Sequence, residues 1–277
     1  MHTIVSGDRT PIAFDRRGSG PPLVLVDGAL CCRRFGPMPS LARLLADRFT
    51  VLNYDRRGRG DSGDSGDYAV ERELEDLGGL LAECDGPASV FGLSAGAALA
   101  LRAAAAGLPI SRLALYEAPY GTGDERRREL LRDYPARLAQ LLTAGQRAAA
   151  IELFLELVDV PVEVVTMLRR TSRWPVLEQL APTLAYDSAV LDQVQLAGAL
   201  PRPLLAAVHV PTLVLAGGAS SAPMRETAGQ IARLLPRAGY RTLAEQTHDV
   251  DPGVLAPVLA DFFGPAPTVA STEVAIE

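Results

Sequence analysis

The most constraining feature of this sequence is an alternation of short apolar runs with longer helical patterns. The runs are rich in Val, Leu and Ile, as in strands buried on both faces of a sheet, and they span residues 21–28, 49–55, 88–94, 111–117, 210–218 and 240–243. Helical patterns separate them, at residues 38–47, 67–83, 95–106, 224–235 and 252–263. This order predicts an α/β fold with a mostly parallel sheet covered by helices on both faces. Residues 3–5 and 11–16 are expected to add antiparallel strands, which gives eight strands in total.

The alternation stops over residues 121–208, where amphipathic segments such as RRRELLRDYPARLAQLL and AAAIELFLELV replace strands. We therefore expect an all-helical lid inserted into a core made of residues 1–120 and 209–264. The apolar side chains of the lid, which include Phe154, Leu157, Met167 and Trp174, are expected to pack against one another and onto the sheet. A minority of them is expected to line a substrate pocket. Residues 265–277 are small and polar with two prolines, so we expect a flexible tail.

The composition is that of an ordinary globular protein. Of 277 residues, 48% are hydrophobic and 22% are charged, which argues against disorder. A net charge of −6 without clustered arginines argues against nucleic acid as a partner. The three cysteines, Cys31, Cys32 and Cys84, include an adjacent pair and fit a reducing compartment. With neither a signal-peptide pattern nor a membrane-spanning run, we expect a cytoplasmic protein that binds a small molecule, and a homo-oligomer is left open.

Residues 92–96 read Gly-Leu-Ser-Ala-Gly and lie between an apolar strand and an alanine-rich helix. At such a turn the G-x-S-x-G pattern holds Ser94 in a strained backbone, and the flanking glycines remove Cβ atoms that would clash. The serine hydroxyl then projects above the sheet as a nucleophile. A glycine-rich loop around a capping serine is the alternative, and the strand and helix on either side favour the nucleophile elbow.

A serine hydroxyl is a weak nucleophile at neutral pH, so Ser94 needs a base within hydrogen-bond reach. Of the three histidines, His2 lies in the leading segment and His209 enters the sheet from the end opposite the elbow. His248 lies between the last strand and the last helix, in a loop that opens at the same sheet edge as the elbow. We predict that His248 is the base, with a capping or surface role as the alternative.

The imidazole in turn needs a carboxylate that holds its tautomer. The loop after the strand at 210–218 reads GGASSAPM and has no acid before Glu226, which is already on the next helix. The strand beside the one that carries Ser94 ends at Glu117, so Glu117 is the predicted acid. The competing carboxylates are the two that follow His248 closely and two in the lid: Asp249, Asp251, Asp187 and Asp192.

Acyl transfer also requires donors aimed at the developing oxyanion. The backbone amide of Ala95, at the start of a helix, is expected to supply one donor, and the amide of Ala29 in the loop VDGAL the other. Leu30, Tyr120 and Trp174 are predicted to contact the substrate.

Over residues 10–263 the chain resembles the α/β-hydrolase superfamily. The stretch YDRRGRGDSG at 54–63 is similar to the turn that these enzymes have after their fourth strand, and GLSAG and THD fall where they have the nucleophile and the base. An acid after the sixth strand, as at Glu117, is similar to a subset of haloalkane dehalogenases and some esterases. Those dehalogenases use an aspartate nucleophile, so the resemblance together with Ser94 implies ester or related acyl chemistry.

One departure concerns the oxyanion loop, where the family usually has His-Gly and this chain has Asp27-Gly28. A carboxylate that points at the oxyanion would oppose catalysis. We therefore expect Asp27 to turn away and to brace its loop by accepting amide hydrogen bonds.

These residues together predict a cofactor-independent serine hydrolase that cleaves a carboxylic ester or lactone of a small, largely apolar substrate. The alternatives are a lyase or cyclase that uses the same pocket without an acyl-enzyme, and a ligand-binding protein. No metal is expected, since no histidines or cysteines have zinc-ligand spacing. Gly58, Gly60 and Gly63 match a dinucleotide-binding pattern, but no helix follows at once and the nearby aspartates would repel a pyrophosphate.

Overall fold

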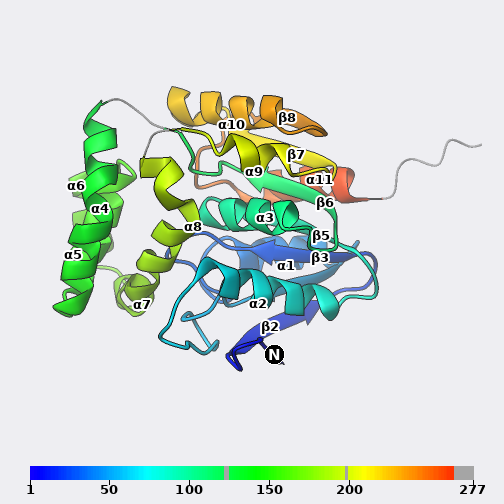
Figure 1. Ribbon diagram of the computed structural model, residues 1–277, viewed down its shortest axis with the longest axis horizontal. Helices are drawn as coiled ribbons and strands as arrows, with labels where there is room; N and C mark the ends of the chain where they lie inside the picture. Colours follow the sequence, from blue (N-terminus) through cyan, green and yellow to red (C-terminus); the bar gives the residue numbers. More distant parts are fainter. Residues whose placement is uncertain (122–124, 197–198, 265–277) are drawn as a thin grey trace, which may run out of the picture.

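An eight-stranded sheet forms the centre of the molecule (Figure 1). The computed structural model describes residues 1–121, 125–196 and 199–264, with the backbone alone described for 125–127 and 192–196. The strands are β1 (His2–Val5), β2 (Pro11–Arg17), β3 (Pro22–Val26), β4 (Thr50–Tyr54), β5 (Ala88–Leu93), β6 (Ile110–Tyr116), β7 (Thr212–Gly217) and β8 (Ala238–Leu243). Their order is β1-β2-β4-β3-β5-β6-β7-β8. The pairs β1 with β2 and β2 with β4 are antiparallel, and all others are parallel.

The predicted fold class is confirmed, and each apolar run of the sequence overlaps one strand. The run that begins at Pro21 becomes β3, whose residues alternate between the two faces of the sheet. Leu23 and Leu25 belong to one buried cluster, and Val24 and Val26 belong to the other. Both faces therefore need a helical cover, which explains why these strands are apolar throughout.

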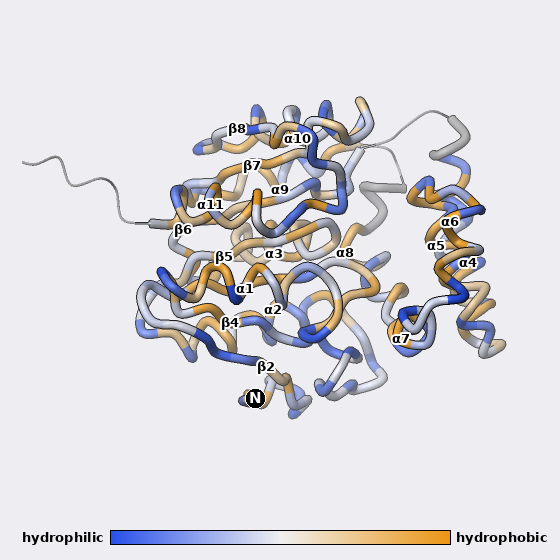
Figure 2. Tube along the Cα trace, turned by 180° about the vertical axis from the view of Figure 1, so that it is seen from behind, coloured by the Kyte–Doolittle hydropathy of each residue, from blue (hydrophilic) through white to orange (hydrophobic). Residues whose placement is uncertain are grey.

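Helices cover the two faces unequally. The face with Leu23 and Leu25 packs against α1 (Met38–Leu45) and α11 (Pro252–Phe263), which contact each other. The opposite face packs against α2 (Val70–Ala82), α3 (Ala95–Ala105) and α10 (Ala222–Leu234). Apolar residues recur along the central strands and α3 (Figure 2).

The segment expected to form a lid contains only helices among its described residues. These are α4 (Glu125–Thr143), α5 (Arg147–Leu157), α6 (Val162–Leu168), α7 (Trp174–Leu180), the 3-10 turn η1 (Ala181–Thr183), α8 (Leu184–Leu196) and α9 (Arg202–Ala206). Helices α4 to α6 lie at one end of the molecule in both views, whereas α8 contacts α2 and α3 of the core (Figure 1 and Figure 2). Helix α9 also contacts α3 and α10, so the lid segment is joined to the core through α8 and α9.

Packing within the lid follows the expectation except at one residue. Trp174 and Leu157 are buried in the cluster that the lid helices share. Met167 is instead 62% exposed, because the short helix α6 buries only Val165. The expected tail, residues 265–277, lies outside the described residues. No helix in the described ranges combines the length and the apolarity that crossing a bilayer requires.

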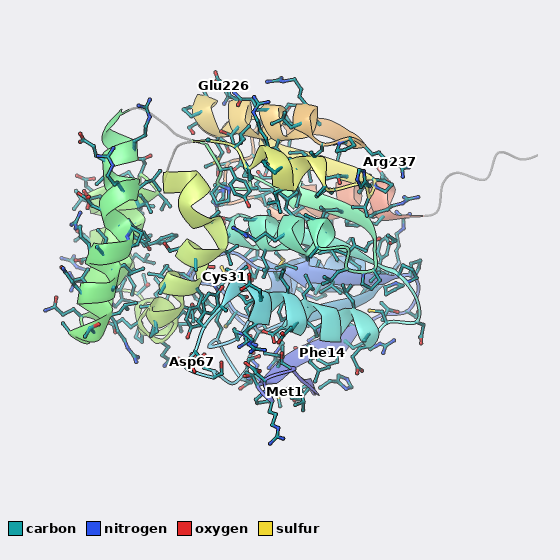
Figure 3. The ribbon with its side chains drawn as sticks, viewed as in Figure 1. Met1, Phe14, Cys31, Asp67, Glu226 and Arg237 are labelled. Atoms are coloured by element: carbon teal, nitrogen blue, oxygen red, sulfur yellow. The ribbon has the colours of Figure 1, made fainter. Side chains whose placement is uncertain are left out.

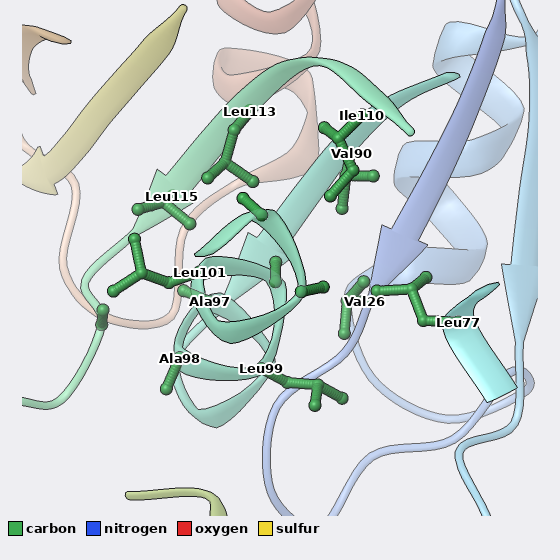
Figure 4. Packing of buried hydrophobic residues seen from close by; sticks show 14 of the residues in the cluster. Val26, Leu77, Val90, Ala97, Ala98, Leu99, Leu101, Ile110, Leu113 and Leu115 are labelled. Atoms are coloured by element: carbon green, nitrogen blue, oxygen red, sulfur yellow. The ribbon is translucent and has the colours of Figure 1, made fainter. Parts of the chain in front are cut away.

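The packing of α3 on the sheet gives a test of the core. Leu99 is fully buried in the cluster that joins α3 to Val26, Leu77 and Val90 (Figure 4). We expect Leu99→Ala to lower the free energy of unfolding by about 2–5 kcal/mol, because it removes buried methyl groups and leaves a cavity. The control, Leu44→Ala on α1, is 49% exposed and should change it by less than about 1 kcal/mol. Urea unfolding measures both, and equal losses would contradict the assigned core.

Candidate active site

Ser94 lies at a strained turn between β5 and α3. Its backbone angles are φ 54° and ψ −124°, a conformation that non-glycine residues rarely adopt. A Cβ atom at Gly96 would lie 2.3 Å from the carbonyl oxygen of Val26, and one at Gly92 would lie 2.6 Å from the Cα atom of Ala97. The two glycines therefore allow the close approach of strand and helix that the turn requires.

Glu117 and His248 form a hydrogen-bonded pair at the same edge of the sheet. Glu117 follows β6 directly, and its Oε2 atom lies 2.7 Å from Nδ1 of His248, in the loop after β8. Its other carboxylate oxygen, Oε1, accepts a hydrogen bond from the amide of Gly217 at 2.8 Å. The glutamate side chain is completely buried, whereas the side chain of His248 is 43% exposed. The Nδ1 atom of the imidazole is thus held by Glu117, and part of the ring is accessible to solvent.

The histidine loop is held in place by two neighbouring strands. The hydroxyl of Tyr116, at the end of β6, donates to the carbonyl oxygen of Thr247 at 2.6 Å. At the end of β7, a Cβ atom on Gly217 would lie 2.3 Å from the carbonyl oxygen of Gln246, so the loop lies against bare backbone there. These contacts hold the two residues that precede His248 in its loop.

The other candidate acids and bases are engaged elsewhere or lie apart. Asp251 accepts the amide of Gly253 and caps α11. Asp187 forms ion pairs with Arg56 and Arg59, and Asp249 is exposed. The side chain of Asp192 lies outside the described residues. Of the other histidines, His2 packs on Phe14 in the sheet and His209 is exposed before β7.

Ser94 and His248 both follow strands whose carboxyl ends lie at one edge of the sheet, as predicted. Within the part of the chain that the structure describes, no hydrogen bond joins Ser94 Oγ to His248. Catalytic hydrogen bonds are often long without substrate and tighten in the reacting complex. The structure therefore brings the predicted base and the predicted acid into contact, and it shows no contact between Ser94 and His248.

Ser94 opens onto a cavity of about 400 Å³ between the sheet edge and the lid. The core contributes Ala29, Ser94, Ala95 and Pro119. The lid contributes mainly apolar side chains: Leu131, Tyr134, Pro135, Phe154, Leu157, Val158, Leu184, Ala185, Asp187, Ser188, Ala189 and Leu191. A small, largely apolar group fits such walls.

The three residues predicted to contact substrate do not belong to the described lining of this cavity. Leu30 and Trp174 are buried in the lid cluster, and Tyr120 is buried in the main core cluster. Their side chains pack between secondary-structure elements. The local sequence does not reveal such long-range packing. Phe154 and Leu157, which the sequence placed among the apolar lid residues, line the cavity in their stead.

The two residues whose backbone amides are predicted to bind an oxyanion both line the cavity. Ala95 and Ala29 line it beside Ser94. Neither amide donates a hydrogen bond to any residue within the described ranges, whereas the neighbouring Gly28 amide does. Ala95 is also the first residue of α3, where the helix dipole favours negative charge.

Asp27 turns into its own loop, as the sequence analysis expected. Its Oδ1 atom accepts the amide of Gly28 at 2.9 Å, and the residue is buried and does not line the cavity. Burial raises the pKa of Asp27 to about 7, against the lowering effect of the Gly28 amide and of Arg59. The carboxyl group is thus far less acidic than an exposed aspartic acid.

A cluster of buried charges beside the cavity was not foreseen. Arg56 and Arg59, from the loop after β4, each donate to Oδ1 of Asp187 on α8 at 2.7 Å. Arg56 also forms a two-pronged pair with Glu73 on α2, at 2.6 and 2.7 Å. The density of arginine and aspartate in YDRRGRGDSG signals buried pairing, but the partners come from distant segments. The label Cys31 in Figure 3 marks the loop that lies beside this cluster. The carbonyl oxygen of Cys31 accepts a hydrogen bond from Arg59.

The comparisons with known proteins agree with this architecture. The chain belongs to the alpha/beta hydrolase family, whose model matches residues 31–258. The structure of an alpha/beta hydrolase from Sphaerobacter thermophilus DSM 20745 is 47% identical, with a TM-score of 0.85 over 95% of this chain and all of that chain. A thermophilic esterase from Thermogutta terrifontis, 22% identical, shares the fold with a TM-score of 0.70 over 94% of this chain and 97% of its own.

Among curated proteins, the uncharacterised hydrolase YraK of Bacillus subtilis (strain 168) is 38% identical over 94 residues. The match includes 32% of this chain, and the chain spans about a third of the length of that relative, 34%. The resemblance inferred from the sequence is thus confirmed at the level of the family. Membership in it supports a hydrolase.

The raised pKa of Asp27 predicts a specific dependence of stability on pH. In the unfolded chain the carboxyl ionises near 3.8, and in the folded chain it stays protonated up to about 7. The folded state binds more protons between these values, so this group makes the protein less stable as the pH rises from about 4 to about 7.

We expect the free energy of unfolding of the native protein, relative to that of Asp27→Asn, to fall by about 4 kcal/mol over this pH range. Urea unfolding at a series of pH values measures the difference. The control is Asp249→Asn, which changes an exposed carboxylate. Parallel stability curves for the native protein and Asp27→Asn would show that Asp27 ionises normally.

Proposed function

We propose that this protein is a cofactor-independent serine hydrolase that cleaves a carboxylic ester or lactone of a small, largely apolar substrate. The observation that carries the proposal is the 2.7 Å hydrogen bond between Glu117 and His248, at the sheet edge where the strained turn directs Ser94 into the cavity. A buried carboxylate paired with Nδ1 leaves Nε2 free to accept a proton.

In the first half of the reaction, Ser94 Oγ attacks the carbonyl carbon of the substrate and His248 Nε2 accepts its proton. The carbonyl oxygen becomes an oxyanion, which the amides of Ala95 and Ala29 stabilise. Glu117 stabilises the imidazolium that forms. His248 then gives the proton to the leaving alcohol, which departs and leaves an acyl group on Ser94.

In the second half, a water molecule attacks the acyl carbon while His248 accepts its proton. The oxyanion forms again between the same two amides and collapses, the acid product leaves, and the proton returns to Ser94. The apolar lid walls exclude bulk water during acylation and bind the aliphatic part of the substrate. Buried Asp27, held on the Gly28 amide, stays out of this cycle.

The first test uses a fluorophosphonate probe and a chromogenic short-chain ester. We expect the probe to label Ser94 and the ester to be turned over. Ser94→Ala should abolish both, and His248→Ala should lower turnover by orders of magnitude. Mass spectrometry locates the label, with Ser188→Ala, which changes the other serine of the cavity wall, as a variant that retains it. Labelling without turnover would favour a lyase or cyclase. The absence of both labelling and turnover would favour a binding protein.

The second test concerns the carboxylate. In Glu117→Gln the amide oxygen can still accept the Gly217 amide, so the fold should be kept. Its NH₂ group would face Nδ1 and favour the tautomer with a proton on Nε2, which cannot accept the serine proton. We expect kcat to fall by about 10²–10⁴-fold. The matched control, Asp249→Asn, changes a carboxylate beside the same histidine and should have little effect. Near-normal turnover in Glu117→Gln would remove this residue from the mechanism.

A further inference from the structure

Arg59 holds the loop that carries one of the two oxyanion donors. Its Nη1 group donates to the carbonyl oxygens of Gly28 and Cys31, the second at 3.3 Å. The guanidinium is buried, with 1% of the residue exposed. A planar guanidinium can make several such bonds at once with a fixed geometry, and each is strengthened by its charge.

The contact with Gly28 has a consequence for the next residue. The carbonyl of Gly28 and the amide of Ala29 belong to one peptide unit, which is planar and trans. In such a unit the C=O and N–H bonds point in opposite directions. Because Arg59 holds the carbonyl on the core side, the Ala29 N–H is directed away from Arg59, and Ala29 lies at the cavity wall beside Ser94.

The lid supplies the counter-charge that holds Arg59 in place. Asp187, on α8, accepts from Nη2 of Arg59 and from Nη1 of Arg56, both at 2.7 Å. Arg56 also lies 3.4 Å from the carbonyl oxygen of Asp27, in the same loop, and is braced by Glu73. Two cations and two carboxylates therefore balance under the loop, and one of the carboxylates comes from the lid.

We infer that Arg59, held by Asp187 of the lid, is the positioning residue that orients the Gly28–Ala29 peptide so that its N–H binds the oxyanion. The inference rests on the proposed function, in which the Ala29 amide is an oxyanion donor. The hydrogen bond from a charged donor to the carbonyl also polarises the peptide and makes its N–H a stronger donor. The lid thus contributes to the oxyanion site through a chain of two hydrogen bonds.

Arg57 provides the matched control within the same loop. It is equally buried and pairs with Asp76 and Asp8. Its other hydrogen bonds go to Ser6, Ser65 and the carbonyl of Arg72. Replacing Arg57 therefore removes a buried, doubly paired arginine without touching the oxyanion loop.

The experiment compares Arg59→Met with Arg57→Met, using a chromogenic short-chain ester and a trifluoromethyl ketone, whose adduct with Ser94 carries an oxyanion. Arg59→Met should lower kcat by about 10–100-fold with little change in KM, and weaken binding of the ketone by the same factor. Arg59→Lys, which keeps the charge and some donors, should restore part of this loss. Arg57→Met should lower stability and leave kcat and the affinity for the ketone near those of the native protein.

A milder pair covers the case in which an arginine variant does not fold. Asp187→Asn and Asp76→Asn each remove one carboxylate partner of a buried arginine. The first should lower kcat and ketone affinity together, and the second should not. Equal effects within either pair, or a loss confined to KM, would overturn the inference.

A readout that does not depend on turnover separates this inference from the proposed function. The carbonyl-carbon NMR resonance of Gly28 and the amide resonance of Ala29 should move in Asp187→Asn and stay in place in Asp76→Asn. If the native protein neither turns over the ester nor reacts with fluorophosphonate, the proposed function fails while these resonances still decide the positioning. Unmoved resonances in Asp187→Asn would overturn the inference even in an active enzyme.

Discussion

The proposed active site depends on one hydrogen bond that crosses the end of a strand. Glu117 follows β6 and His248 follows β8, so β7 lies between the two residues that form the pair. Neighbouring strands are about 4.8 Å apart, and a Cβ atom at the end of β7 would lie 2.3 Å from the carbonyl oxygen of Gln246 in the histidine loop. Gly217 ends this strand with no side chain, offers its amide to the carboxylate, and lets the histidine loop lie against it. The chemistry therefore depends on an absent side chain as much as on the polar ones.

The loop after β4 shows how the fold accommodates buried charge. Arg56, Arg57 and Arg59 are almost fully buried, and each pairs with carboxylates of other elements. Taking such ions out of water is unfavourable by several kcal/mol each, and pairing with good hydrogen-bond geometry offsets this cost. Such networks add little to stability compared with an apolar core of the same volume. What they contribute here is direction, since a guanidinium binds only partners placed in its plane.

Much of the fold and the candidate pair could be predicted because they depend on local patterns. The apolar runs predict the strands, and Ser94 follows from a motif flanked by a strand and a helix. Glu117 and His248 followed from the topology, since the carboxyl ends of parallel strands share an edge. The cavity wall could not be predicted in this way, because Leu30, Tyr120 and Trp174 are used in packing between elements. Asp187 was considered only as an acid for His248, and its pairing with Arg56 and Arg59 joins residues more than a hundred positions apart.

The ion pairs of Asp187 also restrict how the site can admit a substrate. Lifting α8 from the core would leave two guanidinium groups in a dry interior with one carboxylate fewer between them, a loss of about 3–5 kcal/mol when a buried pair is broken. Helices α4 and α5, by contrast, contact each other, and they share an apolar cluster with α7 and η1. Moving α4 and α5 would break neither of the ion pairs of Asp187. Under the proposed function, an opening for substrate and product is therefore favoured between the outer helices, with α8 remaining in place on the core.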